Sequence, residues 1–307
     1  MSEEVAMIIR LVASCVSAAA KAGEIIRDVK SRGELNIVEK KKDDYQTEAD
    51  RSAQRCIVAS LNKRFPDVKV IGEEELPNQE ILDDWVVTNM DSEVMKVHLP
   101  SELQNIKAED LCIWVDPLDG TREYVQGTVE QVTVLIGVAV KDKAVAGVIH
   151  QPYFKNSQDG SLGRTLWGID SVGIGGFKLC PPPDGKRIIT TTKCKFRDEI
   201  QAALDAFEPD GILRVNGAGY KVLQLLDGKA HAYFYANRGY MRWDTCAPEA
   251  ILYAAGGKFT DLRGDRYSYV STTSFPNRRG VLATAPGQDH EWYLDRIPSE
   301  IKMRETD

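Results

Sequence analysis

The sequence predicts a layered α/β protein made of two halves. Candidate helices and strands alternate along the chain, and two apolar runs flank a tight turn at 141–143, which is typical of an antiparallel hairpin. The proline-rich stretch 181–185 indicates a linker. We therefore expect an N-terminal α+β half over residues 1–180 and a C-terminal α/β half over residues 181–307.

The first two elements are expected to be helices. Apolar residues recur at steps of three and four from Ile8 to Ile26, and Gly33 provides a stop. A second helix is predicted to begin near Thr47, which is a suitable N-cap, with Asp50 as the carboxylate of a capping box. The Phe65-Pro66 pair predicts its end.

Short strands follow. Residues 68–71 form an apolar run closed by a glycine, and residues 77–108 are polar and irregular, so we expect an insertion at the surface. A buried strand is predicted over 111–115. The hairpin comprises strands at 131–140 and 145–150.

The second half continues the alternation. The elements expected there are strands at 188–192, 212–215 and 231–236, and helices at 199–207, from about 219, and at 248–255.

Composition limits the class of partner. Of 307 residues, 39 are Lys or Arg and 46 are Asp or Glu, so the net charge of −7 argues against a nucleic-acid polymer. No segment approaches the roughly 18 consecutive apolar residues of a membrane span, and the acidic N-terminus does not resemble a secretory signal. Six scattered cysteines favour reduced thiols. We expect a cytoplasmic monomer without a membrane partner.

Acidic residues gather at the ends of predicted elements, as Asp44 with Asp50, Glu73 with Glu74, Asp116 with Asp119, and Asp244 alone. In the run 116–121, a proline and a glycine force a turn after an apolar strand, so both carboxylates can converge at the strand's end. The Leu118 carbonyl and the Thr121 hydroxyl add oxygen ligands of the kind that Mg²⁺ prefers.

Simpler explanations stay open at this point. Asp50 can be a capping-box residue alone, and Asp244 can be a plain N-cap of a helix with Pro248 in its first turn. A calcium loop counted from Asp116 fits poorly, because Leu118 and Gln126 fall at ligand positions. A covalent aspartyl-phosphate site is a further alternative, although no other feature of the sequence supports it.

Four motifs in order resemble the lithium-sensitive, Mg²⁺-dependent phosphatases typified by inositol monophosphatase. Two further segments resemble the branch of this family that acts on 3′(2′),5′-bisphosphate nucleotides. The four motifs are DYQTEAD at 44–50, IGEE at 71–74, WVDPLDGT at 114–121 and WDTCAPE at 243–249, and the two branch segments are GVIHQPY at 147–153 and VNGAGYK at 215–221.

The resemblance covers nearly the whole chain and implies an α-β-α-β-α sandwich with mixed, largely antiparallel sheets. It also implies two or three Mg²⁺ ions and inhibition by Li⁺. Asp50 and Thr121 match the pair that accepts a proton from the attacking water. The implied metal ligands are Glu73, Asp116, the Leu118 carbonyl, Asp119 and Asp244. The four histidines lie outside the acidic clusters, and we interpret them as structural or surface residues.

The resemblance also assigns substrate contacts to the second half. Thr192, Gly217 and Lys221 match nucleotide-binding positions, as Thr121 does in the first half. Lys195 stands where family members have a histidine, so it retains a cation but loses imidazole stacking. Considered without the family, Lys221 is a solvated helix lysine and Gly217 a turn glycine.

The function expected from the resemblance is hydrolysis of the 3′-phosphate of adenosine 3′,5′-bisphosphate to AMP and phosphate, with its sulfated analogue as a second candidate substrate. This reaction would clear a by-product of sulfation. The alternatives are an inositol phosphate phosphatase, a non-catalytic nucleotide or metal sensor on the same scaffold, and a scaffold whose acidic clusters are accidental.

Overall fold

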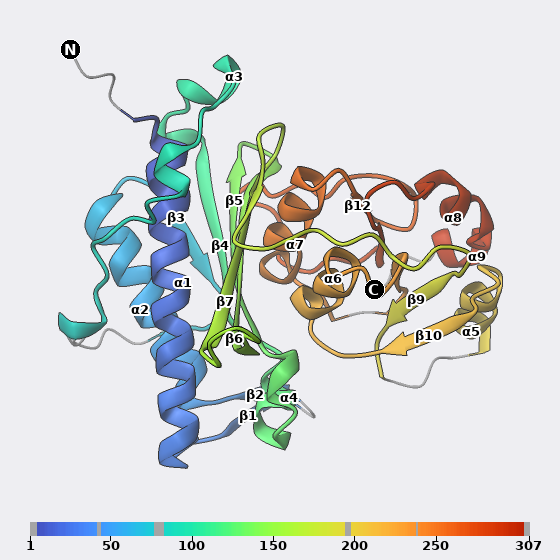
Figure 1. Ribbon diagram of the computed structural model, residues 1–307, viewed down its shortest axis with the longest axis horizontal. Helices are drawn as coiled ribbons and strands as arrows, with labels where there is room; N and C mark the ends of the chain where they lie inside the picture. The colour runs from blue at the N-terminus through green and yellow to red at the C-terminus, as the bar shows by residue number, and fades with distance from the viewer. Residues whose placement is uncertain (1–4, 42–43, 77–82, 194–197, 238, 304–307) are drawn as a thin grey trace.

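The computed structural model describes residues 5–41, 44–76, 83–193, 198–237 and 239–303. Helices and sheets alternate as layers in the order α-β-α-β-α, from left to right in Figure 1. The expected sandwich is therefore confirmed. The helices of the three α layers are α1 (Met7–Arg32) and α2 (Glu48–Arg64) outside, α6 (Ala218–Leu226) and α7 (Arg242–Ala254) in the middle, and α5 (Asp198–Asp205), α8 (His290–Arg296) and α9 (Ser299–Lys302) on the far side.

The first sheet has six strands, and all neighbouring pairs are antiparallel except β3 with β4. Its last two strands were not predicted, because their glycine-rich sequence lacks an alternating pattern. The strands in spatial order are β3 (Lys69–Gly72), β4 (Leu111–Asp119), β5 (Thr133–Val140), β6 (Lys143–Lys155), β7 (Leu162–Ile169) and β8 (Gly173–Gly175).

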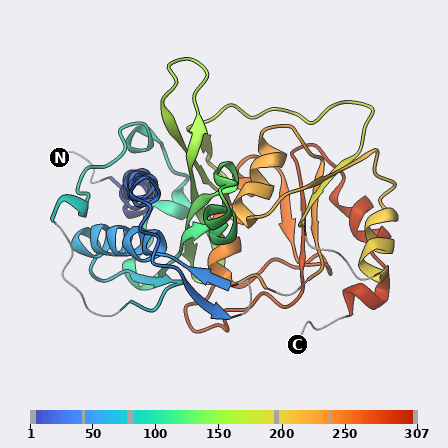
Figure 2. The ribbon, with the colours of Figure 1, turned by 90° about the horizontal axis from the view of Figure 1, so that it is seen from below.

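The second sheet has five strands and mixes both senses, since β9 is parallel to its two neighbours and β13 antiparallel to both of its own. The strands in spatial order are β10 (Gly211–Arg214), β9 (Ile188–Thr191), β11 (Ala232–Tyr235), β13 (Val281–Thr284) and β12 (Lys258–Thr260). Figure 2 shows this sheet between the middle and outer helices. The domain division at residue 180 stays a prediction.

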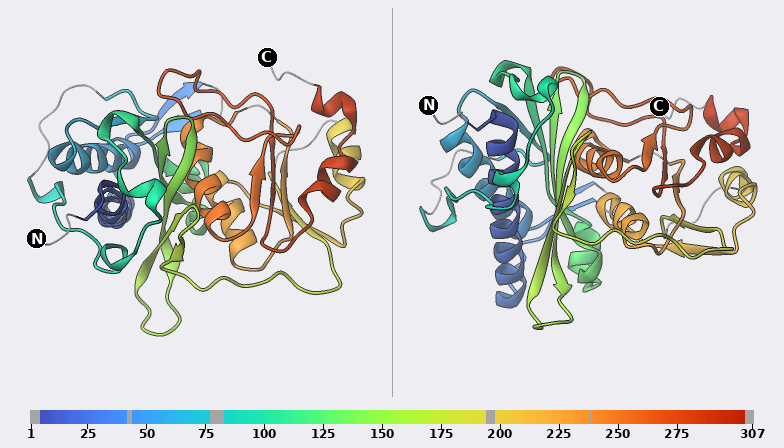
Figure 3. Two further views of the ribbon diagram at one scale, coloured as in Figure 1. Left: turned by 90° about the horizontal axis from the view of Figure 1, so that it is seen from above. Right: turned by 45° about the horizontal axis from the view of Figure 1, so that its top comes forward.

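Helix α7 is positioned by its close packing against the first sheet. A Cβ added to Gly137 would lie 2.5 Å from the Cys246 side chain, and one added to Gly147 would lie 2.4 Å from the Ala247 carbonyl oxygen. The two glycines therefore let α7 lie directly on strands β5 and β6, which fixes its first turn relative to β4. Both views in Figure 3 show α7 against the sheet.

The segment expected as a surface insertion is irregular but packs more closely than predicted. Val94 is fully buried, and Trp85, Met90 and Leu103 pack against the core that contains α1. The side chains that make these contacts are too widely spaced to show a period. Residues 77–82 of this segment lie outside the described residues. Its short helices are η1 (Asp83–Trp85), η2 (Val94–Lys96), α3 (Ser101–Gln104) and η3 (Ala108–Asp110).

Three small elements surround the ends of β4 and β3. The charged hairpin was not predicted, because four exposed residues in its first strand show no alternation. These elements are the hairpin β1 (Val38–Lys41) and β2 (Asp44–Gln46), the helix α4 (Thr121–Gln126) and the turn η4 (Val129–Gln131).

The prediction for the third helix of the second half was wrong at its start. The helix α7 begins at Arg242, six residues before the expected position, and its N-cap is Met241. Asp244 therefore lies inside the first turn, and Pro248 lies in the helix interior. Packing against the sheet compensates for the missing proline N–H, which sequence propensity counts as a break.

The described histidines are structural or surface residues, as expected. His150, His231 and His290 are buried and bonded to protein groups, and His98 is exposed. The described cysteines are free thiols. No described helix has the length and apolar character needed to cross a membrane.

Candidate active site

The end of β4 presents two buried carboxylates. Asp116 and Asp119 are 2% and 7% exposed, and the register with β5 shifts between them. The Leu118 N–H donates to Asp116 Oδ1 at 3.0 Å, which forms a tight turn. Gly120 follows with φ of 93° and leads into α4. The end of β4 and the turn that follows it therefore direct both carboxylates into the interior.

Asp119 also anchors helix α6. Its Oδ1 accepts from the Ala218 N–H at 3.0 Å, and its Oδ2 accepts from the Gly219 N–H at 2.8 Å. Thr133 donates to the same Oδ2 at 2.8 Å. A Cβ on Gly217 would lie 3.0 Å from Asp119 Oδ2, and its φ is 78°, so a side chain there would be strained and crowded. Gly217 is thus more than a turn glycine, because it admits the carboxylate to the helix end.

Asp244 brings the third carboxylate from α7. The Met241 N–H donates to Asp244 Oδ2 at 2.6 Å, so Asp244 has a capping role as well, but as the third helical residue and not as the N-cap. One oxygen from each of Asp116, Asp119 and Asp244 lies within 4.8 Å of the others. Three acidic oxygens at this spacing fit a hard divalent cation.

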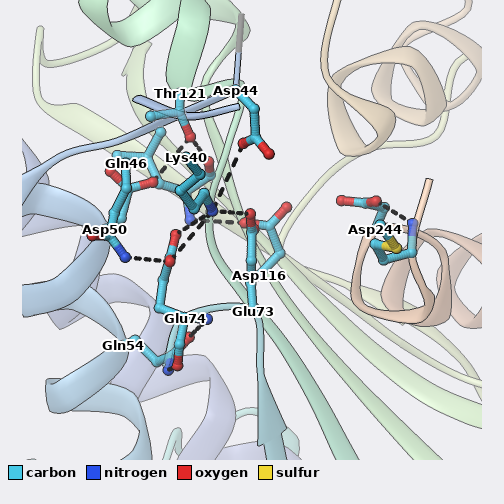
Figure 4. Close-up of polar contacts among 12 residues, drawn as sticks. Lys40, Asp44, Gln46, Asp50, Gln54, Glu73, Glu74, Asp116, Thr121 and Asp244 are labelled. Atoms are coloured by element: carbon cyan, nitrogen blue, oxygen red, sulfur yellow. Dashed lines mark hydrogen bonds and ion pairs between the residues drawn. The ribbon is translucent and has the colours of Figure 1, made fainter. Parts of the chain in front are cut away.

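Glu73 lies beside this group but pairs with a lysine from the β1–β2 hairpin (Figure 4). Lys40 Nζ is 3.0 Å from Glu73 Oε1 and 3.1 Å from Glu74 Oε1. Gln46 donates to the Glu74 carboxylate, and Gln54 exchanges two hydrogen bonds with the Glu74 backbone. The sequence analysis missed these partners. No local pattern connects a lysine on an exposed hairpin with an acid 33 residues later.

Asp50 and Thr121 are in direct contact. Thr121 Oγ1 lies 2.9 Å from Asp50 Oδ1 and 3.0 Å from the Leu118 carbonyl oxygen. The other Asp50 oxygen accepts from the N–H and the hydroxyl of Thr47, at 2.7 and 2.6 Å. The capping-box interpretation of Asp50 is therefore correct, but it uses only one of the two carboxylate oxygens.

The clustered acids are difficult to ionise together. Burial raises the pKa of Asp50 to about 7. Burial, followed by repulsion from Glu73, Asp119 and Asp244, raises the pKa of Asp116 well above its usual range. The pKa is also raised, chiefly by burial, at Glu73, Asp119 and Asp244.

Metal-free protein is expected to lose stability as pH rises. The folded state keeps protons that the unfolded chain releases, so the free energy of unfolding falls from about pH 4 towards pH 7, by about 1.4 kcal/mol for each unit by which a pKa is raised. Mg²⁺ should reverse the fall by compensating the charges. Urea unfolding at pH 5 and pH 8, in EDTA and in Mg²⁺, measures the effect. Stability independent of Mg²⁺ at pH 8 would contradict it and would favour accidental clusters.

The predicted substrate residues lie near the same site to different degrees. Thr192, the residue after β9, is buried and donates to Asn216 Oδ1 at 3.0 Å. Asn216 Nδ2 donates to Glu123 Oε1 in α4 at 2.6 Å, so this missed asparagine connects the second half to the helix that begins at Thr121. Lys195 lies outside the described residues.

Lys221 is not a solvated helix lysine. It is 2% exposed, and its Nζ donates to the Gly217 carbonyl and the Tyr240 hydroxyl, both at 3.1 Å. Its charge lowers the pKa of Asp119, although less than burial raises it. Lys221 therefore lies close to Asp119, with its ammonium group near the rings of Tyr233 and Tyr240.

The chain is similar to known proteins over nearly its whole length. The inositol monophosphatase family profile matches residues 10–302. The chain is 47% identical over 305 residues to the human protein named 3′(2′),5′-bisphosphate nucleotidase 1, covering 98% of both chains. The rat protein of that name is 46% identical, covering 96% of both chains. A crystal structure of extragenic suppressor protein suhB from Bartonella henselae shares the fold, with a TM-score of 0.66 at 22% identity, covering 94% of this chain and 98% of that one. The chain belongs to the inositol monophosphatase family.

Proposed function

We propose that the protein is a Mg²⁺-dependent phosphatase that hydrolyses the 3′-phosphate of adenosine 3′,5′-bisphosphate to AMP and phosphate. The observation that carries the proposal is the convergence of Asp116, Asp119 and Asp244 within 4.8 Å. The names of the human and rat relatives support the nucleotide as substrate. The phosphatase class follows from the same relatives and from the family profile, and it argues against a non-catalytic sensor.

The residues proposed to hold Mg²⁺ are Glu73, Asp116, the Leu118 carbonyl, Asp119 and Asp244. When bound, the two or three ions supply positive charge for the phosphoryl group and lower the pKa of water. The family resemblance further supports inhibition by Li⁺. Carboxylates dominate this donor set, which suits Mg²⁺ better than a soft metal.

Asp50 and Thr121 are proposed to take the proton of the attacking water. Asp50 Oδ1 has the Thr121 hydroxyl at 2.9 Å, whereas Oδ2 is held by Thr47. A proton leaving the Thr121 hydroxyl can therefore pass to Asp50 while Thr47 keeps the carboxylate orientation. A carboxyl whose pKa is raised to about 7 can hold that proton near neutral pH.

Substrate selection is proposed to involve Thr121, Thr192, Lys195, Gly217 and Lys221. Thr192 directly follows β9 and donates to Asn216, and Lys221 is close enough to Asp119 to lower its pKa. The buried position of Lys221 supports a role in orienting Tyr240 and the α6 terminus around the substrate. The sulfated analogue of the nucleotide is proposed as a second substrate. An inositol phosphate is the alternative substrate, since the matching family profile is named after inositol monophosphatase.

Phosphate release tests the proposal. We expect strong preference for adenosine 3′,5′-bisphosphate over inositol 1-phosphate and inositol 1,4-bisphosphate in Mg²⁺, no release in EDTA, and reduced release when Li⁺ is added. Preference for an inositol phosphate would keep the metal site and overturn the substrate. No release from any of the three would overturn both. The monomeric state and the cytoplasmic location stay predictions.

A further inference from the structure

A cavity of about 380 Å³ lies beside the first turn of α7 and the chain between β12 and β13. Four arginines line it, Arg242 from α7 and Arg266, Arg278 and Arg279 from the connecting chain. We call it the arginine pocket. The connecting chain is held against the first sheet, because the Tyr269 N–H donates to the Asp142 carbonyl at 2.9 Å and its carbonyl accepts from the Trp114 indole at 3.2 Å.

Two of the four arginines have carboxylate partners. Arg266 Nε donates to the fully buried Glu249 at 2.8 Å, and its Nη1 lies 3.8 Å from Asp170. Arg279 lies 3.4 Å from Asp261, which also lines the cavity, and 3.7 Å from Asp265. Within the described part of the chain, Arg242 and Arg278 form no ion pair. The described carboxylates near the arginine pocket all pair with Arg266 and Arg279, so Arg242 and Arg278 are the two arginines left to meet an anion.

Of the two arginines without an ion pair, Arg242 also lacks hydrogen-bond partners, in the described part of the chain, for two of its nitrogens. Its Nε and Nη1 atoms are buried and have no hydrogen-bond partner among the described residues. Its guanidinium lies 5.0 Å from the Tyr267 ring centre and 6.0 Å from that of Tyr269. The ring faces favour a cation there, but neither tyrosine is a hydrogen-bond partner of these two nitrogens. Leaving buried N–H groups of a guanidinium without acceptors is costly, and an anion in the cavity would supply acceptors to them.

We propose that the arginine pocket binds a small anion that carries a phosphate or sulfate group. Arginine is the residue best suited to such groups, and the Ser274 hydroxyl in the lining adds a donor. The volume falls in the range of small-molecule sites, so the anion can carry an organic group that packs on Tyr267.

The arginine pocket is separate from the acidic site. Arg242 and Asp244 are two residues apart on α7, so their side chains leave the helix about 200° apart. Asp244 faces Asp116 and Asp119, whereas Arg242 faces Tyr267 and Tyr269. The ligand would therefore occupy a second site, on the opposite side of the helix that carries one proposed metal ligand.

Calorimetric titration with sodium sulfate tests the proposal. The full chain is used in EDTA at constant ionic strength, so that the acidic site, left without cations, repels the probe. We expect one binding site, with affinity lowered about tenfold in Arg278→Gln and abolished in Ser274→Glu, which places a carboxylate at the arginines. Arg242→Gln should weaken sulfate binding more than Arg278→Gln does. Arg32→Gln, an exposed arginine on α1, is the matched control and should change nothing.

The exposed positions of Arg278 and Ser274 keep the test valid even if Arg242→Gln fails to fold. Phosphate and AMP are then titrated in the same way, to distinguish a free inorganic anion from an organic phosphate. Tighter binding of either supports the proposal. Absence of sulfate binding in the unmodified chain would overturn it. Binding that survives in Arg278→Gln and Ser274→Glu but is lost in Thr192→Ala would overturn it too, because the probe would then occupy the substrate region.

Discussion

Replacing Asp116 by asparagine is expected to lower kcat about a thousandfold, which corresponds to about 4 kcal/mol of transition-state stabilisation. Asp116 is next to Glu73, Asp119 and Asp244, each of which raises its pKa after burial. Removal of its charge weakens the carboxylate group proposed to hold Mg²⁺. The turn after β4 should persist, because an asparagine oxygen can still accept from the Leu118 N–H.

The same substitution should make the metal-free protein more stable. It removes one of several buried like charges, so the free energy of unfolding in EDTA rises at pH 8 while turnover is lost. Steady-state phosphate release and urea unfolding measure the two effects. Asp159→Asn, on the exposed β6–β7 loop, is the control and should alter neither. Turnover within threefold of the unmodified protein would contradict the proposed role of Asp116.

Replacing Asp50 by asparagine is expected to lower kcat by a factor of about 10² to 10⁴, with little change in KM. The asparagine oxygen can accept both hydrogen bonds from Thr47, so α2 keeps its cap. Its amide then faces the Thr121 hydroxyl, which must accept where it previously donated. The proton can no longer pass to residue 50, so a relay is lost while the fold is retained.

Variants of Thr121 distinguish a relay from a packing role. Thr121→Ser keeps a hydroxyl near Asp50 Oδ1 and should retain most activity, whereas Thr121→Val should resemble Asp50→Asn. The acidic limb of the pH profile of kcat should disappear in Asp50→Asn. Equal loss in Thr121→Ser and Thr121→Val, with an unchanged pH profile, would assign the pair a structural role only.

Local patterns predicted much of the first half. The stop at Gly33, the cap at Thr47 and the turn after Asp116 depend on contacts between residues a few positions apart. Such contacts leave a signature in adjacent letters of the sequence. The strands β7 and β8 lacked one, because their pairing partner and not their own composition holds them in the sheet.

The start of α7 shows how tertiary packing overrides local propensity. Pro248 suggested a first-turn position and therefore a later start, but glycines on β5 and β6 let the helix lie against the sheet from Arg242 onward. This shift changes Asp244 from an N-cap to a residue within the first turn, where its carboxylate faces β4. The sequence identified the residue correctly and its local role incorrectly.

The sequence by itself determined the layered α/β class, the caps and turns, and the acids available at the ends of strands and helices. Only the tertiary structure decided which of them meet: Asp244 with Asp116 and Asp119, Lys40 with Glu73, and Asp119 with the start of α6. It also left two buried nitrogens of Arg242 without a hydrogen-bond partner among the described residues. The physical reason is distance along the chain, because hydrogen bonds within one turn follow from neighbouring residues, whereas contacts between layers follow from how whole faces pack.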